Sequence, residues 1–188
     1  MGLANRITVF RIALAPVFAG LFSAWFVWHD PKWLWLVWAV FLVSEASDVL
    51  DGWVARKLKQ TSDLGKVLDP FSDVISRLTI FACLLMAGVA PLWFFLVVLY
   101  RELSMTFLRL LMVQRGVVQA ASIGGKLKAW LYFFASLAGL VQVSAPTWLS
   151  PPLGFVVLNG LFALAGLQSL FSFGQYWAGY RRLVRSQS

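Results

Sequence analysis

The sequence predicts an all-α integral membrane protein with six transmembrane helices, and three observations lead to this class. Apolar residues make up 60% of the 188 residues and charged residues only 13%, whereas soluble domains have roughly half and a quarter. The mean hydropathy is +0.77. The 10 Trp and 16 Phe are too many for one small core to bury. Helices satisfy their own backbone hydrogen bonds in lipid, so these values favour helices and disfavour a soluble fold, a disordered chain or a disulfide scaffold.

Six apolar stretches each have roughly the 20 residues that a bilayer crossing needs. Turn-forming residues separate them: Asp30-Pro31, the 88–91 segment, Gly124-Gly125 and the proline-rich 145–152 segment. In chain order, the predicted spans are residues 7–28, 32–56, 67–88, 91–114, 127–143 and 153–176. The residues before the first span are expected to form a short interfacial segment along the inner surface. No second domain is indicated, so residues 1–188 are expected to form a single membrane domain.

The distribution of Lys and Arg predicts the orientation in the membrane. With the N-terminus inside, the outer turns hold only Lys32. The inner segments hold Arg6, Arg56, Lys57, Lys59, Lys66, Arg115, Lys126, Lys128, Arg181, Arg182 and Arg185. Positive residues concentrate on the cytoplasmic side, so both termini are expected in the cytoplasm and the protein in the inner membrane. The net charge of +8 then reflects contact with anionic membrane lipid rather than with nucleic acid.

Four carboxylates stand where the second predicted span ends and the third begins. Asp48 and Asp51 are three residues apart, and Asp69 and Asp73 are four apart, so each pair shares one helix face. Two antiparallel helices joined by a short loop can direct both faces to one point. Four converging carboxylates repel one another strongly at low dielectric constant. Divalent cations offset such repulsion, and carboxylate oxygens suit Mg²⁺ or Mn²⁺. The sequence therefore predicts a two-metal site.

Small residues and one arginine accompany these carboxylates. Gly52 and Ala55 lie on or near the Asp48 face and leave space for a bulky ligand, and Gly65 would likewise allow a close approach. Arg56 adds a fixed cation suited to a phosphate. Carboxylates, metals, small residues and an arginine together indicate a diphosphate-binding site.

The segment reads D-x-x-D-G-x-x-A-R, then eight residues, then G-x-x-x-D-x-x-x-D, from Asp48 to Asp73. This pattern resembles the signature of the CDP-alcohol phosphotransferase family, with every specified position met. The resemblance implies a six-helix membrane enzyme that commonly forms homodimers. It also implies metal-binding roles for Asp48, Asp51, Asp69 and Asp73, a general-base role for Asp73, and nucleotide contacts from Gly52, Ala55, Arg56 and Gly65.

Three further cations bear on the acceptor alcohol. Arg101 and Arg109 are eight residues apart in the fourth predicted span, and Lys126 opens the fifth. Facing the acidic site, they could hold the phosphate of glycerol 3-phosphate. The pattern R-E, a later R and G-K-x-K resembles the glycerol 3-phosphate branch of the family, which implies transfer of a phosphatidyl group from CDP-diacylglycerol. The opening N-x-x-T-x-x-R resembles that branch too, and it implies contacts of Asn5, Thr8 and Arg11 with the substrate diphosphate.

Other readings stay open at this point. Val74 stands where that branch often has Lys, and Ala129 where it often has Thr, although Arg77 could replace the missing cation. Inositol phosphate, serine or an amino alcohol therefore remain alternative acceptors. A divalent-cation channel or transporter is a more remote alternative, since a cation pathway gains nothing from Arg56 beside its carboxylates.

Overall fold

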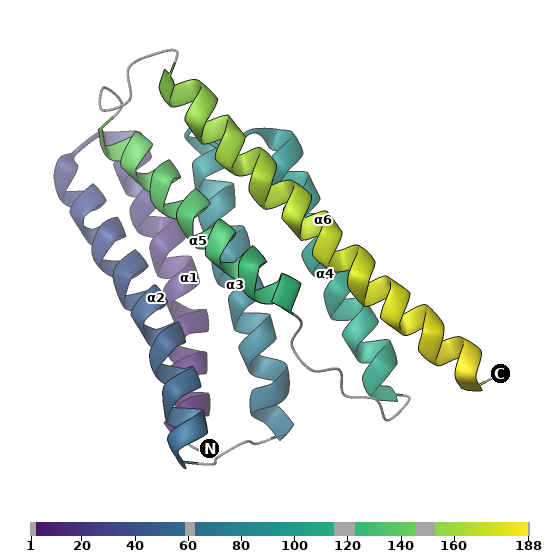
Figure 1. The fold of residues 1–188 in the computed structure, drawn as a ribbon. Helices are drawn as coiled ribbons and strands as arrows, with labels where there is room; N and C mark the ends of the chain where they lie inside the picture. Colours follow the sequence, from purple (N-terminus) through teal and green to yellow (C-terminus); the bar gives the residue numbers. More distant parts are fainter. Residues whose placement is uncertain (1–2, 59–62, 115–122, 146–152, 188) are drawn as a thin grey trace. The chain divides into compact units, whose positions relative to one another are not determined.

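The structure of the chain is a computed structural model. It describes the backbone of residues 3–58, 63–114, 123–145 and 153–187, and the side chains of residues 6–48, 50, 68–112, 125, 127–145 and 154–182. The regular secondary structure in these ranges is entirely helical. The six helices are α1 (Leu3–Trp28), α2 (Pro31–Leu58), α3 (Asp63–Met86), α4 (Leu92–Gln114), α5 (Ile123–Ser144) and α6 (Leu153–Gln187) (Figure 1). The predicted all-α class with six helices is confirmed.

Three of the described helices are long and apolar enough to span a membrane. The stretches concerned are Arg6–Trp28, Leu127–Ser144 and Gly154–Arg182. Many large apolar side chains are also exposed, among them Trp35, Phe107, Phe155, Leu167 and Phe171. Exposed apolar surface of this extent is foreign to soluble monomers, and it fits a chain whose outer surface faces lipid.

The helix bounds differ most from the predicted spans at the starts of α1, α3 and α5 and at the end of α6. Helix α3 begins at Asp63, four residues before the predicted span. Leu3–Arg6 continue as the first turns of α1 and form no separate segment ahead of it. Gly124 and Gly125 lie in the first turn of α5 and not in a loop, because glycine is least costly where the backbone N–H groups lack intrahelical partners anyway. Helix α6 runs 35 residues to Gln187, since backbone hydrogen bonding continues past the last apolar residue.

The chain forms two compact units, Met1–Ala87 and Gly88–Ser188, and each is described by itself. In the first unit, α1 packs against both α2 and α3 (Figure 1). Fully buried aromatic side chains hold the three helices together: Phe22 from α1, Phe41 from α2 and Phe81 from α3.

The junction between α1 and α2 is set by an Asp-Pro pair. Asp30 precedes the helix, and its Oδ1 accepts a hydrogen bond of 3.0 Å from the backbone N–H of Lys32. Pro31 occupies the first helical position, where a missing N–H costs nothing. Hydrogen bonds from Lys32 hold the pKa of the Asp30 carboxyl below its usual value. The cap therefore operates in the ionised state and weakens as the pH falls through that lowered pKa.

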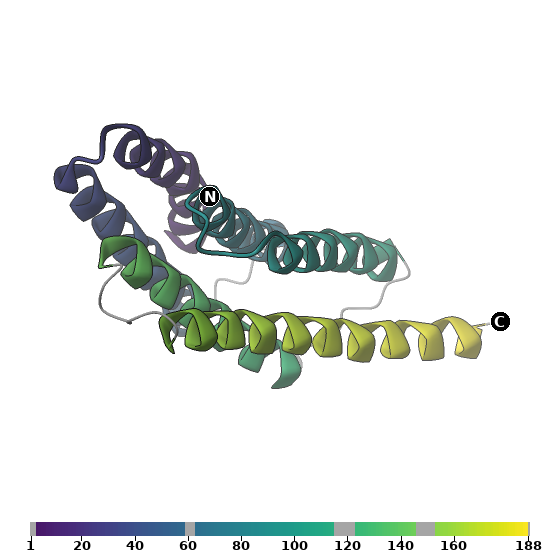
Figure 2. The same cartoon turned by 90° about the horizontal axis from the view of Figure 1, so that it is seen from above.

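In the second unit, α6 packs against α4 and α5, as Figure 2 shows for α5 and α6. The rings of Phe94 and Phe162 meet with centroids 4.7 Å apart. A Cβ placed on Gly166 would lie 3.5 Å from Trp93 and 3.7 Å from Phe94. A Cβ at this position of α6 would thus make ordinary contacts with α4, and a larger side chain would meet the two rings.

We expect Gly166→Leu to lower the stability of the second unit, because the added side chain meets the rings of Trp93 and Phe94. Overpacking of this kind costs about 1–3 kcal/mol. Gly174→Leu on the same helix is the matched control, since a Cβ there meets nothing within 4 Å. Thermal unfolding in detergent should show a lower midpoint for Gly166→Leu only. Equal midpoints for the two variants would show that α4 leaves room for a larger side chain at position 166.

Candidate active site

A polar cleft opens between α1, α2 and α3 in the first unit. Its lining residues are Arg11, Ser44, Glu45, Asp48, Asp73, Ser76 and Arg77, and the empty space among them is about 180 Å³ with open solvent included. The structure thus brings together one carboxylate from each predicted pair, Asp48 from α2 and Asp73 from α3. Both remain accessible, with 45% and 38% of their side chains exposed.

Arg11 of α1 ties the other two helices of the first unit together. Its side chain is only 4% exposed and forms an ion pair with Asp48. Its Nε also donates a hydrogen bond of 2.7 Å to Ser72 Oγ on α3. A buried guanidinium is costly unless it is paired and hydrogen-bonded, so these contacts fix the position of the Asp48 carboxylate.

Thr8 lies one turn before Arg11 on the same face of α1. Its side chain is fully buried, and its hydroxyl donates a hydrogen bond of 2.9 Å to Asp69 Oδ1. The residue expected to contact the nucleotide is therefore placed against a predicted metal ligand. Its contact with a nucleotide stays a prediction.

Arg77 of α3 makes a bidentate contact with Glu45 of α2. Its Nη1 and Nη2 donate to Glu45 Oε1 and Oε2 at 2.8 and 3.1 Å, while its Nε lies 3.6 Å from Asp73 Oδ1. The sequence interpretation singled out Arg77 but missed Glu45 and Ser72. The available signal was the position of Glu45 within an apolar span, where an acidic residue needs a partner.

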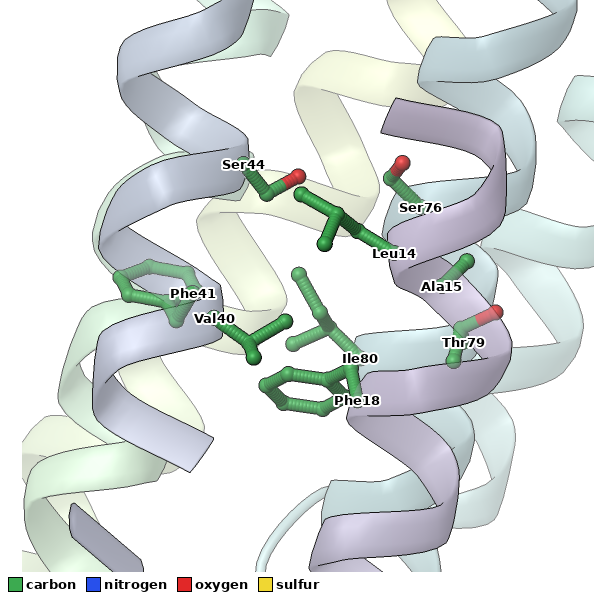
Figure 3. A pocket seen from close by; sticks show the side chains of 9 residues that line it. All are labelled: Leu14, Ala15, Phe18, Val40, Phe41, Ser44, Ser76, Thr79 and Ile80. Carbon is green, nitrogen blue, oxygen red and sulfur yellow. The ribbon is translucent and has the colours of Figure 1, made fainter. Parts of the chain in front are cut away.

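A mainly apolar cleft adjoins the polar cleft, with about 230 Å³ of empty space, open solvent included. Ser44 and Ser76 line both clefts, and they lie in the upper part of Figure 3, on α2 and α3. Phe18, Val40 and Ile80 line the rest of the space in that view. Apolar surface therefore begins directly beside the charged groups.

Carboxylates of the polar cleft fit a divalent cation by their chemistry. Asp48 and Asp73 present accessible oxygens, the ligand type that Mg²⁺ and Mn²⁺ prefer. Among the described side chains, no group of three acidic, His or Cys residues forms a metal-binding cluster. The Asp51 side chain lies outside the described residues, so the two-metal site stays a prediction.

Several other predicted site residues lie in helices but have side chains outside the described residues. They are Asn5 in α1, Asp51, Gly52, Ala55 and Arg56 in α2, Gly65 in α3 and Lys126 in α5. Their roles stay predictions.

A second charged group lies in the second unit, where Glu102 pairs with two cations. Arg101 Nη1 lies 2.9 Å from Glu102 Oε2, and Lys128 Nζ lies 2.7 Å from Glu102 Oε1. Arg101 Nη2 also donates to Ser172 Oγ at 3.1 Å. We call these four residues the Glu102 cluster. The three charged side chains are only 3–8% exposed, and the cluster connects α4 with α5 and α6.

The three cations predicted to hold the acceptor phosphate differ in their surroundings. Arg101 is engaged by Glu102, although its Nε has no hydrogen-bond partner among the residues that the structure describes. Arg109 of α4 is half-buried, and among the described residues it has no ion-pair partner. Lys126 lies outside the described side chains. The acceptor role of all three stays a prediction.

Comparison with known proteins identifies the family. The sequence model of the CDP-alcohol phosphatidyltransferase family matches residues 1–167. The chain belongs to this family. It is therefore a phosphatidyltransferase, and its spanning helices make it an integral membrane protein. The motif from Asp48 to Asp73 lies within the matched residues, so the predicted family is confirmed.

Relatives named for one reaction cover most of the chain. The chain is 39% identical to the CDP-diacylglycerol--glycerol-3-phosphate 3-phosphatidyltransferase of Treponema pallidum over 149 residues, covering 75% of this chain and 69% of the relative. It is 35% identical to the protein of the same name from Bacillus subtilis, covering 74% and 77%. A probable phosphatidylglycerophosphate synthase of Mycobacterium tuberculosis is 32% identical, covering 85% and 78%.

We expect Glu102→Gln to destabilise the second unit severely, because it removes the buried carboxylate that both Arg101 and Lys128 contact. Breaking a buried pair in this way costs roughly 3–5 kcal/mol. Adding Lys128→Met removes one uncompensated charge and should recover part of the loss. Unfolding midpoints in detergent measure both effects. If the midpoint of Glu102→Gln equalled that of the unaltered protein, the Glu102 cluster would not stabilise the second unit.

Proposed function

We propose that the enzyme transfers a phosphatidyl group from CDP-diacylglycerol to glycerol 3-phosphate, releasing CMP and forming phosphatidylglycerophosphate. The names of the relatives support this acceptor. The observation that carries the proposal is the polar cleft, where Asp48 and Asp73 stand on facing helices beside apolar surface. A charged cleft of this kind beside apolar surface suits a substrate with a diphosphate head and lipid tails.

In the proposed reaction, the hydroxyl oxygen of the acceptor forms a bond to the phosphorus that carries the diacylglycerol. The bond from this phosphorus to the CMP oxygen breaks, and CMP leaves with the bonding electron pair. Asp73 takes the proton of the attacking hydroxyl. Mg²⁺ or Mn²⁺ bound by Asp48, Asp51, Asp69 and Asp73 would neutralise the diphosphate and the leaving group.

The residues around these carboxylates would act by holding them in place. Arg11 fixes Asp48, and Thr8 fixes Asp69, through the contacts described above. Positioning of this kind supplies much of the rate in phosphoryl transfer, because the reacting groups are already aligned. The proposed nucleotide contacts come from Gly52, Ala55, Arg56, Gly65, Asn5 and Thr8. The proposed contacts to the acceptor phosphate come from Arg101, Arg109 and Lys126.

The proposal places the enzyme in the inner membrane, with both termini and the active site in the cytoplasm. The concentration of Lys and Arg in the predicted inner segments supports this orientation. We also propose that the enzyme works as a homodimer, with membrane lipid as its surroundings and no nucleic-acid partner.

An acceptor panel tests the proposal. Purified enzyme with CDP-diacylglycerol and Mg²⁺ should release CMP with glycerol 3-phosphate, and far more slowly with inositol phosphate, serine or an amino alcohol.

The same assay tests the metal role, because excess chelator should stop the reaction. Asp69→Asn should insert normally but lose activity, since it weakens the metal site without adding a buried charge. Faster CMP release with any other acceptor would contradict the proposed substrate, and full turnover in chelator would contradict the metal role.

Arg109→Ala tests the acceptor phosphate contact. A charge-assisted hydrogen bond is worth roughly 1.5–3 kcal/mol, so the KM for glycerol 3-phosphate should rise about ten- to a hundredfold. The KM for CDP-diacylglycerol should change little, because its diphosphate is held elsewhere. Arg109→Lys should recover only part of the loss, since an ammonium makes no bidentate contact. An unchanged acceptor KM, or equal losses for both substrates, would remove Arg109 from the acceptor site.

A further inference from the structure

Glu45 and Arg77 both lie outside the motif from Asp48 to Asp73, one on each side of it, and both line the polar cleft. Both Nη groups of Arg77 donate to the two carboxylate oxygens of Glu45, at 2.8 and 3.1 Å. Only 7% of the Arg77 side chain and 19% of the Glu45 side chain is exposed. A bidentate contact fixes the plane of the guanidinium as well as its position.

This fixed plane determines which nitrogen atom of Arg77 lies near Asp73. With both Nη groups held by Glu45, the Nε edge is the part that lies near Asp73, 3.6 Å from Oδ1. Asp73 precedes Arg77 by one helical turn on α3, so the two side chains share a face. The contact is longer than a strong hydrogen bond, and 38% of the Asp73 side chain stays exposed.

The charges that line the polar cleft explain why Glu45 is needed. Facing Asp73 are the cations Arg11 and Arg77 and the carboxylates Glu45 and Asp48. Arg11 is engaged by Asp48 and Ser72. Without Glu45, the guanidinium of Arg77 would be free to turn its Nη groups onto Asp73 and form a full ion pair there.

We propose that Glu45 and Arg77 are positioning residues for Asp73: Glu45 holds the guanidinium so that it orients the Asp73 carboxylate without covering it. This inference rests on the proposed role of Asp73 at the metals and the acceptor hydroxyl. It assigns a function to Glu45, and it gives Arg77 a role through Asp73 rather than at a substrate.

Mn²⁺ binding tests the proposal without any acceptor. Arg77→Lys keeps the charge but loses the bidentate contact, and Glu45→Gln releases the guanidinium toward Asp73. Loss of a residue that orients a metal ligand typically weakens metal binding about ten- to a hundredfold. Both variants should therefore raise the Kd for Mn²⁺, measured from the electron paramagnetic resonance signal of free Mn²⁺ in detergent. Lys32→Ala is the matched control, since it breaks an exposed ion pair with Asp30 in the same unit and should leave the Kd unchanged.

A charge swap separates positioning from a simple tie between α2 and α3. Glu45→Arg and Arg77→Glu should each lower the unfolding midpoint, and the double variant should recover it because the pair is restored. CMP release should stay low in the double variant, because a carboxylate then stands beside Asp73. Recovery of CMP release together with stability would overturn the proposal, as would an unchanged Kd for Mn²⁺ in both single variants of the binding test.

The outcomes also distinguish this inference from the proposed function. Weakened Mn²⁺ binding in Arg77→Lys and Glu45→Gln, combined with a different preferred acceptor in the panel, would support the positioning pair and contradict only the choice of glycerol 3-phosphate. An unaltered protein that binds no Mn²⁺ would overturn both the metal role of Asp73 and the positioning pair.

Discussion

Burying a charge away from water is costly unless an opposite charge or several hydrogen bonds accompany it, and this cost organises both units of the chain. Among the described residues, the buried charged side chains are Arg11, Arg77, Arg101, Glu102 and Lys128. Each has a partner on its own or another helix. In the first unit the partners of the arginines include carboxylates of the candidate active site, so the contacts that compensate buried charge also fix the site.

Two residues of the polar cleft could be predicted from the sequence, because Asp48 and Asp73 belong to carboxylate pairs at helical spacing within a long motif. The sequence placed the two pairs on faces of two successive helices that could point to one place, and the structure brings Asp48 and Asp73 to one cleft. Glu45 and Ser72 could not be placed in the same way. Their roles depend on how α2 and α3 are rotated about their axes, and the contact of Glu45 with Arg77 joins residues 32 positions apart. The sequence did contain a signal for Glu45, because an acidic residue within an apolar span needs a cationic partner. It contained no such signal for Ser72.

The six helices could also be predicted, because apolar stretches of bilayer length are a strong signal, but their ends could not. Hydropathy marks where a chain leaves lipid, whereas a helix ends where its backbone hydrogen bonds end. For this reason the prediction stopped at residue 176 while α6 continues to Gln187. The Glu102 cluster shows a similar limit. The sequence placed Arg101 in an acceptor pocket, and the side-chain geometry adds that Glu102, its direct neighbour, holds it together with Lys128.

The length of α6 has a consequence for how the protein sits in lipid. At about 1.5 Å per residue, its 35 residues extend about 52 Å, whereas the hydrocarbon core of a bilayer is about 30 Å thick. An ordinary tilt of about 20° absorbs only a small part of the difference. The helix therefore projects well beyond the hydrocarbon, and Arg181 and Arg182 are exposed near its end. Anionic headgroups attract such residues, so the density of negative lipid at the surface helps to set how deeply this helix is drawn into the membrane.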